Sequence, residues 1–329
     1  MFDIISIGDC VVDAFMFIND FEIRCDVDKE NCKLCVNYAD KVPVEKFKLC
    51  LAGNANNNAV GSARLGMKTA IYTEIGEDNN GKMIVDSLRK EGISLDFVNL
   101  NKGANTNLHS VISYQGERTI FVYHEKRDYK LPKFEEAPKW IYYTSLAEGF
   151  EPFQEELVGY LAANPSVKLG FNPATFHLKA GLEVLRNIIK LTEVIFVNKE
   201  EAKRLLGIDE KKHMSFEDLH KEIAKLGVKI SVITDGPKGS TVYDGKDFYQ
   251  LGLYDVPIVE RTGVGDSFAT AFIAALFYGK GIEEALKWGT VESSGVIQKI
   301  GPQEGLMTKA ELDAILAKNP TYTEVSLLA

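Results

Sequence analysis

The sequence predicts an α/β fold, in which a mostly parallel central sheet is covered by helices on both faces and a small β-sheet stands beside it. From residue 140 onward, short apolar runs alternate with longer stretches of helical pattern, which is typical of a parallel sheet. Two other β-rich segments, at about residues 13–50 and 107–125, fall outside this alternation, and we expect them to pair with each other. The 329 residues are enough for one such domain, spanning residues 1–329.

The N-terminal half supplies the first strands and a helix of small residues. Its predicted strands lie at residues 2–8, 69–76, 110–114 and 118–123. The last two flank Gln115-Gly116-Glu117, which is a hairpin signal. Its predicted helices lie at residues 51–66, where Gly66 supplies the cap, and 79–91.

The C-terminal half is regular. Its predicted strands lie at residues 140–143, 167–172, 194–198 and 230–234, followed by a hairpin at 241–251. Its predicted helices lie at residues 153–163, 267–278, 282–298 and from 308 onward. Ligands of parallel α/β sheets gather at the carboxyl ends of the strands, and Asn172, Asn198 and Thr234 all fall there.

Composition narrows the functional classes. The net charge of −9 argues against a nucleic-acid surface, which requires a basic face. The N-terminus lacks the basic segment of a signal peptide, and no apolar run reaches membrane-spanning length, so we expect a cytosolic protein without a membrane partner. The first strand ends in Gly8-Asp9-Cys10, which lacks the dinucleotide fingerprint and argues against a dehydrogenase, and the chain has no Walker A sequence.

All five cysteines lie within the first 50 residues. Disulfides are unusual in the cytosol, so we expect reduced thiols. The spacing of Cys32 and Cys35 also suits a metal, with Cys25 as a third ligand, and structural zinc is the alternative.

The most informative stretch is the glycine turn at residues 263–266. Gly263 and Gly265 let successive amide groups point toward one anion, and the helix that follows adds its positive dipole end. Asp266 would repel a phosphate, but it makes sense as a base that takes a proton from an attacking hydroxyl. An ordinary helix N-cap explains the same pattern equally well.

This stretch resembles the D-T-x-G-A-G-D signature of the ribokinase/PfkB family of carbohydrate and nucleoside kinases. Glu260 stands in place of the first Asp, Arg261 in place of Thr, and Val264 in place of Ala, whereas the Gly-x-Gly-Asp core is intact. The resemblance implies a ribokinase-like fold with Asp266 as catalytic base. The anion hole would be formed by the amides of Gly263, Val264, Gly265 and Asp266.

The resemblance also implies an acceptor site. Residues 52–66 are similar to the family signature G-G-x-x-x-N-x-A-x-x-x-A-R-L-G, with Ala52 replacing its first Gly. Gly53, Asn54 and Asn57 are the implied substrate-binding residues there, and Asp13, just beyond the first strand, would bind substrate hydroxyls. A tightly packed helix accounts for the small residues but leaves the asparagines unexplained.

The remaining motifs imply a nucleotide site. Asn198 and Glu201 match an N-x-x-E motif that holds Mg²⁺ through water, although a helix capping box has the same spacing. Thr234, Gly236 and Gly239 match T-x-G-x-x-G, which lines the nucleotide in the family and would otherwise read as a turn. The loop at Gly301 would shelter the adenine and, in potassium-activated relatives, part of a K⁺ site.

The expected function is ATP-dependent phosphorylation of an alcohol group on a sugar or sugar-like molecule. The two β-rich segments would then form a lid over the sugar, and in the family such a lid often serves as a dimer contact. A nucleoside kinase on the same fold is the nearest alternative, with Phe15, Phe17, Tyr114 and Phe121 available for a base. A phosphorylated sugar would need basic residues, for which Arg24, Arg118 and Arg127 are candidates. A silent sugar- or nucleotide-binding protein with a cysteine module is the alternative from another class.

Overall fold

The computed structural model describes residues 1–26, 32–114, 117–318 and 326–328. Its main sheet has ten strands in the order β16-β15-β14-β13-β12-β11-β10-β1-β6-β7. The parallel strands are β1 (Ile4–Ile7), β6 (Thr69–Gly76), β7 (Ser94–Asn101), β10 (Trp140–Tyr143), β11 (Lys168–Phe171), β12 (Val194–Asn198) and β13 (Ile230–Thr234). An antiparallel edge is added by β14 (Ser240–Tyr243), β15 (Phe248–Leu251) and β16 (Ser326–Leu328).

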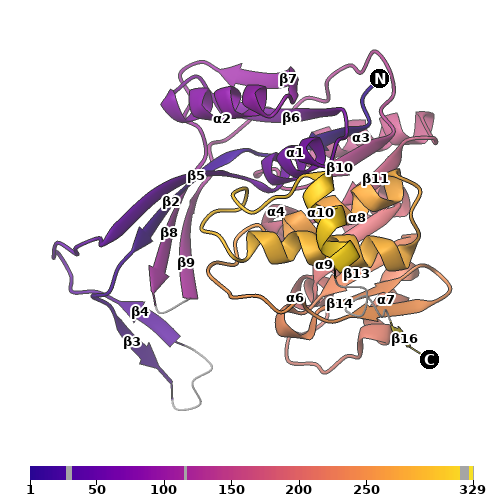
Figure 1. The fold of residues 1–329 in the computed structure, drawn as a ribbon. Coiled ribbons are helices and arrows are strands. Elements are labelled where there is room, and N and C mark those ends of the chain that lie inside the picture. The colour runs from indigo at the N-terminus through magenta and orange to yellow at the C-terminus, as the bar shows by residue number, and fades with distance from the viewer. Residues whose placement is uncertain (27–31, 115–116, 319–325, 329) are drawn as a thin grey trace.

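Helices cover both faces of this sheet, as predicted (Figure 1). One face carries α1 (Asn54–Arg64), α2 (Asn79–Lys90), α8 (Val264–Phe277), α9 (Ile282–Val296) and α10 (Lys309–Lys318). The other carries α3 (Glu151–Ala163), α5 (Leu182–Lys190), α6 (Lys199–Leu205) and α7 (Phe216–Ala224), with the short α4 (Thr175–Ala180) beside them.

Successive side chains of the central strands pack alternately into two hydrophobic cores, one on each face of the sheet. Ile4 and Tyr142 pack with the α8 and α9 side, whereas Ile5 and Tyr143 pack with the α3 and α5 side. Strands buried on both faces require apolar residues at every position, which explains the continuous apolar runs in the sequence.

A second, four-stranded sheet projects from the main body (Figure 1). Its order is β5 (Lys46–Ala52), β2 (Val11–Phe17), β8 (Leu108–Tyr114) and β9 (Glu117–Tyr123), so it joins the two segments set apart in the sequence. Strands β2 and β8 are parallel, and the other pairs are antiparallel. Its inner face packs Phe15, Cys50 and Val111 against Ile300 of the main body. We call this sheet the lid sheet.

The cysteine prediction is corrected by the hairpin of β3 (Glu22–Cys25) and β4 (Cys32–Cys35). Its antiparallel register sets Cys25 opposite Cys32, and these two form a disulfide, whereas Cys35 is a free thiol. The expected reduced state is therefore wrong for this pair, and the predicted three-cysteine zinc set is not formed. Across the described ranges, no three His, Cys, Asp or Glu side chains are grouped to hold a metal ion.

None of the helices in the described part of the chain combines the length and the apolar character needed to cross a membrane.

Candidate active site

The glycine turn forms the first turn of α8, three residues earlier than the sequence pattern suggested. Gly263 is the N-cap residue with φ of 79°, and a Cβ there would lie 2.4 Å from the Cβ of Pro302, so only glycine fits. The first amides of a helix have no partner within it, which leaves the N–H groups of Gly265 and Asp266 facing outward. This end of α8 therefore suits an anion.

Asp266 lies in this first turn, partly buried. Burial raises the pKa of its carboxyl, a hydrogen bond from Asn57 lowers it, and the charge of Asp13 raises it, which together leave the pKa at about 6. A carboxylate with a pKa near 6 is mostly ionised at neutral pH and is still basic enough to accept a proton from a hydroxyl.

Asn57 supports Asp266 directly. Its Nδ2 donates a hydrogen bond to Asp266 Oδ2 at 2.7 Å, and its Oδ1 accepts one from Gln303 Nε2 at 3.3 Å. The structure thus places this predicted substrate-binding residue beside Asp266, where it orients the carboxylate. Gly53, at φ of 100°, allows α1 to begin against the backbone of Asp9, because a Cβ would lie 2.4 Å from the Asp9 carbonyl oxygen. Asn54 Nδ2 donates to Asn172 Oδ1 at 3.3 Å.

Three adjoining pockets surround these groups. The first, here the glycine pocket, is lined by Thr234, Gly236, Gly239, Leu253, Gly265 and Phe268. The second, the Asp266 pocket, shares Thr234, Gly265 and Phe268 with the first. The third, the histidine pocket, contains His109 and His124 and shares Asn54, Asn172 and Glu201 with the second. Asp266 therefore lines the middle pocket of one continuous groove.

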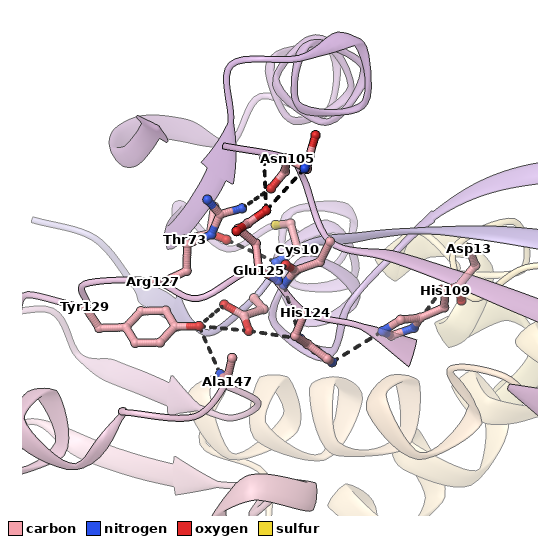
Figure 2. Close-up of polar contacts among 12 residues, drawn as sticks. Cys10, Asp13, Thr73, Asn105, His109, His124, Glu125, Arg127, Tyr129 and Ala147 are labelled. Carbon is pink, nitrogen blue, oxygen red and sulfur yellow. Dashed lines mark hydrogen bonds and ion pairs between the residues drawn. The ribbon is translucent and has the colours of Figure 1, made fainter. Parts of the chain in front are cut away.

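The histidine pocket has a polar wall that the sequence analysis did not anticipate (Figure 2). Asp13 of β2 is buried, with His109 Nδ1 3.1 Å from its Oδ1, and His109 Nε2 lies 3.4 Å from His124 Nε2. Asp9, also buried, accepts a hydrogen bond from Tyr129 Oη at 2.9 Å. Burial and the charge of Asp9 raise the pKa of Tyr129, which keeps the phenol protonated as a donor.

Asn198 and Glu201 adopt the capping box that was one of the two interpretations. Asn198 Oδ1 accepts from the Glu201 amide at 2.8 Å, and a Glu201 carboxylate oxygen accepts from the Asn198 amide at 2.8 Å. Glu201 nevertheless faces the groove, since it lines both the Asp266 pocket and the histidine pocket. Burial raises the pKa of Glu201, as does the charge of Asp266, while the Asn198 amide lowers it.

Thr234, Gly236 and Gly239 come together in the glycine pocket, beside the N-terminus of α8. Gly301 does not line this pocket. It lies against the lid sheet instead, where a Cβ would be 2.6 Å from Cys50 Sγ. The structure therefore brings three of the four predicted nucleotide-loop residues to one place.

Two arginines complete the Asp266 pocket. Arg118 of the lid sheet lies 3.3 Å from Oε1 of the buried Glu260, which also accepts hydrogen bonds from the amide and hydroxyl of Thr262 at 2.8 and 2.7 Å. Arg118 and Arg261 both line the pocket. The substitution of Glu260 for Asp thus coincides with a contact between lid sheet and glycine turn. Of the other candidate cations, Arg24 pairs with Glu22 on the exposed hairpin, and Arg127 is buried.

Comparison with known proteins agrees with this geometry. Residues 10–309 match the model of the pfkB family carbohydrate kinases. An uncharacterized sugar kinase of Archaeoglobus fulgidus is 25% identical over 256 residues, covering 75% of this chain and 98% of that protein. A nucleoside kinase of Methanocaldococcus jannaschii aligns with a TM-score of 0.79 at 19% identity over 96% of this chain and 98% of that one. Arabidopsis thaliana ribokinase complexed with ribose and ATP aligns with a TM-score of 0.78 at 19% identity, over 96% of this chain and 98% of that one.

The chain belongs to the pfkB family of carbohydrate kinases. The expected ribokinase-like fold is confirmed. The protein is a phosphotransferase of this family with an alcohol group as acceptor.

Proposed function

We propose that the protein transfers the γ-phosphoryl group of ATP to a hydroxyl of a sugar or sugar-like small molecule, with Asp266 as the general base. One observation carries the proposal: Asp266 lines the pocket that shares lining residues with the glycine pocket on one side and with the histidine pocket on the other. A kinase needs a donor site and an acceptor site that converge on one base, because phosphoryl transfer depends mainly on positioning and charge stabilisation.

The reaction follows from this arrangement. ATP binds with its phosphates toward the start of α8, and Asp266 takes the proton of the acceptor hydroxyl as its oxygen attacks the γ-phosphorus in line. Negative charge that develops on the transferring group is met by the free amides of Gly265 and Asp266 and by Arg118 and Arg261. Movement of the lid sheet over the groove would exclude water and limit ATP hydrolysis.

Mg²⁺ fits the donor set at Glu201. This ion usually keeps several water ligands and takes one or two carboxylates together with substrate phosphates, so a single carboxylate in the groove is sufficient. The burial that raises the pKa of Glu201 leaves a carboxylate whose ionised form a cation would stabilise. A bound Mg²⁺ would supply charge neutralisation on the phosphates. Dependence on K⁺ stays a prediction.

A nucleoside is the second candidate acceptor, supported by the structural likeness to the nucleoside kinase from M. jannaschii. The four aromatic residues suggested for a base are not gathered in the groove. Among the described residues lining the Asp266 and histidine pockets, none is Phe15, Phe17, Tyr114 or Phe121. A sugar is therefore the better-supported acceptor, and the intact Asp266 argues against a silent binding protein.

We also propose a homodimer formed through the lid sheet. Phe47, Phe121 and Tyr123 are large apolar side chains of this sheet that are more than 40% exposed. Exposed apolar side chains gathered on one element often mark an interface. Sedimentation velocity at micromolar concentration measures this assembly directly.

The test of the activity is ADP formation with Mg-ATP against pentoses, hexoses, sugar phosphates and nucleosides, with product mass determined by mass spectrometry. We expect one acceptor to gain the mass of a phosphoryl group. Incubation with and without K⁺ tests the cation requirement in the same plate. Absence of any phosphorylated product while ATP still binds would contradict the proposal.

A further inference from the structure

We propose that Gln303 is a positioning residue for Asp266, because it holds Asn57 in the place from which Asn57 donates to the Asp266 carboxylate. This inference rests on the proposed function, in which Asp266 is the general base. Gln303 Nε2 donates a hydrogen bond to Asn57 Oδ1 at 3.3 Å, and Asn57 Nδ2 donates to Asp266 Oδ2 at 2.7 Å. The three side chains come from the loop after α9, from α1 and from α8, so segments far apart in the sequence meet in one chain of hydrogen bonds.

Gln303 lies outside the groove. It is not among the described residues that line the glycine pocket, the Asp266 pocket or the histidine pocket, so we expect it to touch neither ATP nor the acceptor. It lines a separate cavity together with Arg64 and Glu91. We therefore expect its influence on the reaction to pass through Asn57.

The backbone of the loop that carries Gln303 is fixed by an arginine of α1. Arg64 Nη1 donates to the carbonyl oxygens of Gln303 at 2.8 Å and of Leu306 at 3.1 Å. Its other guanidinium nitrogens, Nε and Nη2, donate to the two carboxylate oxygens of Glu91 at 3.0 and 2.6 Å. A guanidinium held by such a bidentate contact has little freedom, so it fixes the loop against α1. Asn57 belongs to the same helix, and Gln303 is thus anchored relative to the side chain it contacts.

The contact from Gln303 affects Asn57 in two ways. A hydrogen bond at each end of the asparagine amide removes its freedom to rotate away from Asp266. A donor on the amide oxygen also polarises the amide group, which makes its N–H a better donor. Both effects favour the ionised form of Asp266, because an ionised carboxylate only accepts hydrogen bonds.

The other groups near Asp266 stay in place when Gln303 is replaced by an uncharged residue. The titratable and charged groups that interact with Asp266 or line its pocket come from several elements and are Asp13, Glu201, Tyr142, Arg118 and Arg261. None of them is altered by such a substitution. A change in the pKa of Asp266 then reports the contact with Asn57.

The pKa of Asp266 can be measured without any catalytic assay. In protein labelled with ¹³C at the aspartate carboxyl carbons, the Asp266 signal is identified by its absence in Asp266→Asn, and its chemical shift is followed from pH 4 to 8. Gln303→Met keeps the length of the side chain but has no donor. We expect it to move the titration midpoint to higher pH by up to about one unit, as the loss of one hydrogen bond predicts. An unmoved midpoint would overturn the inference even if the protein proves to be an active kinase.

A double-mutant cycle shows whether Gln303 acts through Asn57. We expect Gln303→Met to shift the midpoint in the wild-type background and to cause no further shift in Asn57→Ala, because the connecting side chain is then missing. Equal shifts in the two backgrounds would contradict the inference, since they would show an effect that does not need Asn57.

The kinetic consequence is a lower kcat with little change in binding. We expect Gln303→Met to lower kcat at pH 7 by about threefold to tenfold with an unchanged KM for ATP, which is the size of one hydrogen bond. The loss should be larger in Gln303→Glu, because its carboxylate would accept from Asn57 Nδ2 and turn the amide oxygen toward Asp266. A smaller loss in Gln303→Glu than in Gln303→Met would contradict the assigned contact. Absence of turnover by the wild type would instead count against the proposed function, and the titration of Asp266 then still decides the role of Gln303.

Gln298→Met is the matched control. Gln298 is half-buried like Gln303, and its Nε2 donates to the carbonyl oxygen of Ser294 in α9 at 2.8 Å. We expect its substitution to leave both kcat and the titration of Asp266 unchanged. Melting temperatures of all variants establish that they fold. A midpoint shifted as far by Gln298→Met as by Gln303→Met would contradict a specific role for Gln303.

Discussion

At the scale of single residues, the carboxyl group of Asp266 is the centre of the account. Its environment combines a burial that favours the protonated form with an Asn57 donor that favours the ionised form. The balance leaves the pKa at about 6, where a base is effective at neutral pH.

This pKa predicts the pH dependence of the reaction. The base must be ionised, so kcat/KM for the acceptor should be constant above pH 7 and should fall tenfold per pH unit below about 6. The hydrogen bond from Asn57 lowers the pKa of Asp266, so Asn57→Ala should raise that pKa. The acidic fall in kcat/KM should then occur at a higher pH in this variant. Steady-state rates between pH 5 and 8 measure both, and an unmoved limb in Asn57→Ala would contradict the assigned contact.

At the scale of elements, the first turn of α8 tests the anion hole through two neighbouring glycines. Gly263 has a left-handed φ and contacts Pro302, whereas nothing lies within 4 Å of a Cβ at Gly265. Gly263→Ala should therefore lose at least about 1 kcal/mol of unfolding free energy as well as activity.

Gly265→Ala is the matched variant. Its stability should be unchanged or higher by up to about 1 kcal/mol, because alanine favours a helix. Its kcat should still fall by about tenfold to a hundredfold, because the methyl group stands where the phosphoryl group approaches. Urea unfolding and ADP assays measure both quantities, and full activity in Gly265→Ala would argue against phosphate binding at this turn.

Helix α9 carries a second buried acid. Glu292 is fully buried, its Oε1 accepts from the Met307 amide at 2.9 Å, and burial raises its pKa from 4.5 to about 8. The folded state therefore binds a proton more tightly than the unfolded state. Its contribution to stability is present below pH 4.5 and is lost as the pH rises to about 8.

Glu292→Gln removes this titration and keeps the acceptor for Met307. We expect the variant to match the wild type near pH 5 and to be more stable by about 2–4 kcal/mol at pH 9. Thermal or urea unfolding at the two pH values measures the difference. A stability difference that does not depend on pH would show that Glu292 keeps an ordinary pKa.

At the scale of the whole molecule, Arg118 and Glu260 connect the lid sheet to the glycine turn. Loss of this cation should lower kcat by about tenfold or more. The variant would lack the positive charge that stabilises the transferring phosphoryl group, and it would also lack the contact between the lid sheet and Glu260 of the glycine turn. Arg118→Gln tests this, and Arg24→Gln is the control, since Arg24 pairs with Glu22 on the exposed hairpin. Similar kinetics in the two variants would exclude a role for this connection.

The sequence was sufficient for most of the fold because local patterns determine it. The apolar runs at 69–76 and 194–198 coincide with β6 and β12, and Asp266 and Thr234 were found from motifs within a few residues. The predicted start of α8 was too late, because glycines are poor helix formers and their presence did not indicate a first helical turn. The geometry of that turn depends on the contact between Gly263 and Pro302.

The rest depended on contacts between distant residues. Asp13 and His109 face each other only because β2 and β8 pair in parallel, with these two residues in register. The Cys25–Cys32 disulfide likewise depends on the register of β3 and β4, which the cysteine spacing did not reveal. The available signal for the polar wall was the pair of histidines, His109 and His124, that flank the predicted hairpin.

The central claim is that Asp266 deprotonates the acceptor, and one comparison tests it most directly. Acceptor-dependent ADP formation by wild type and Asp266→Asn should be measured at pH 7.5, with ATP and acceptor binding determined by calorimetry. We expect the variant to bind both ligands and to lose at least about 10²-fold in kcat, in the range found for general-base removal. Unchanged turnover in Asp266→Asn would contradict it.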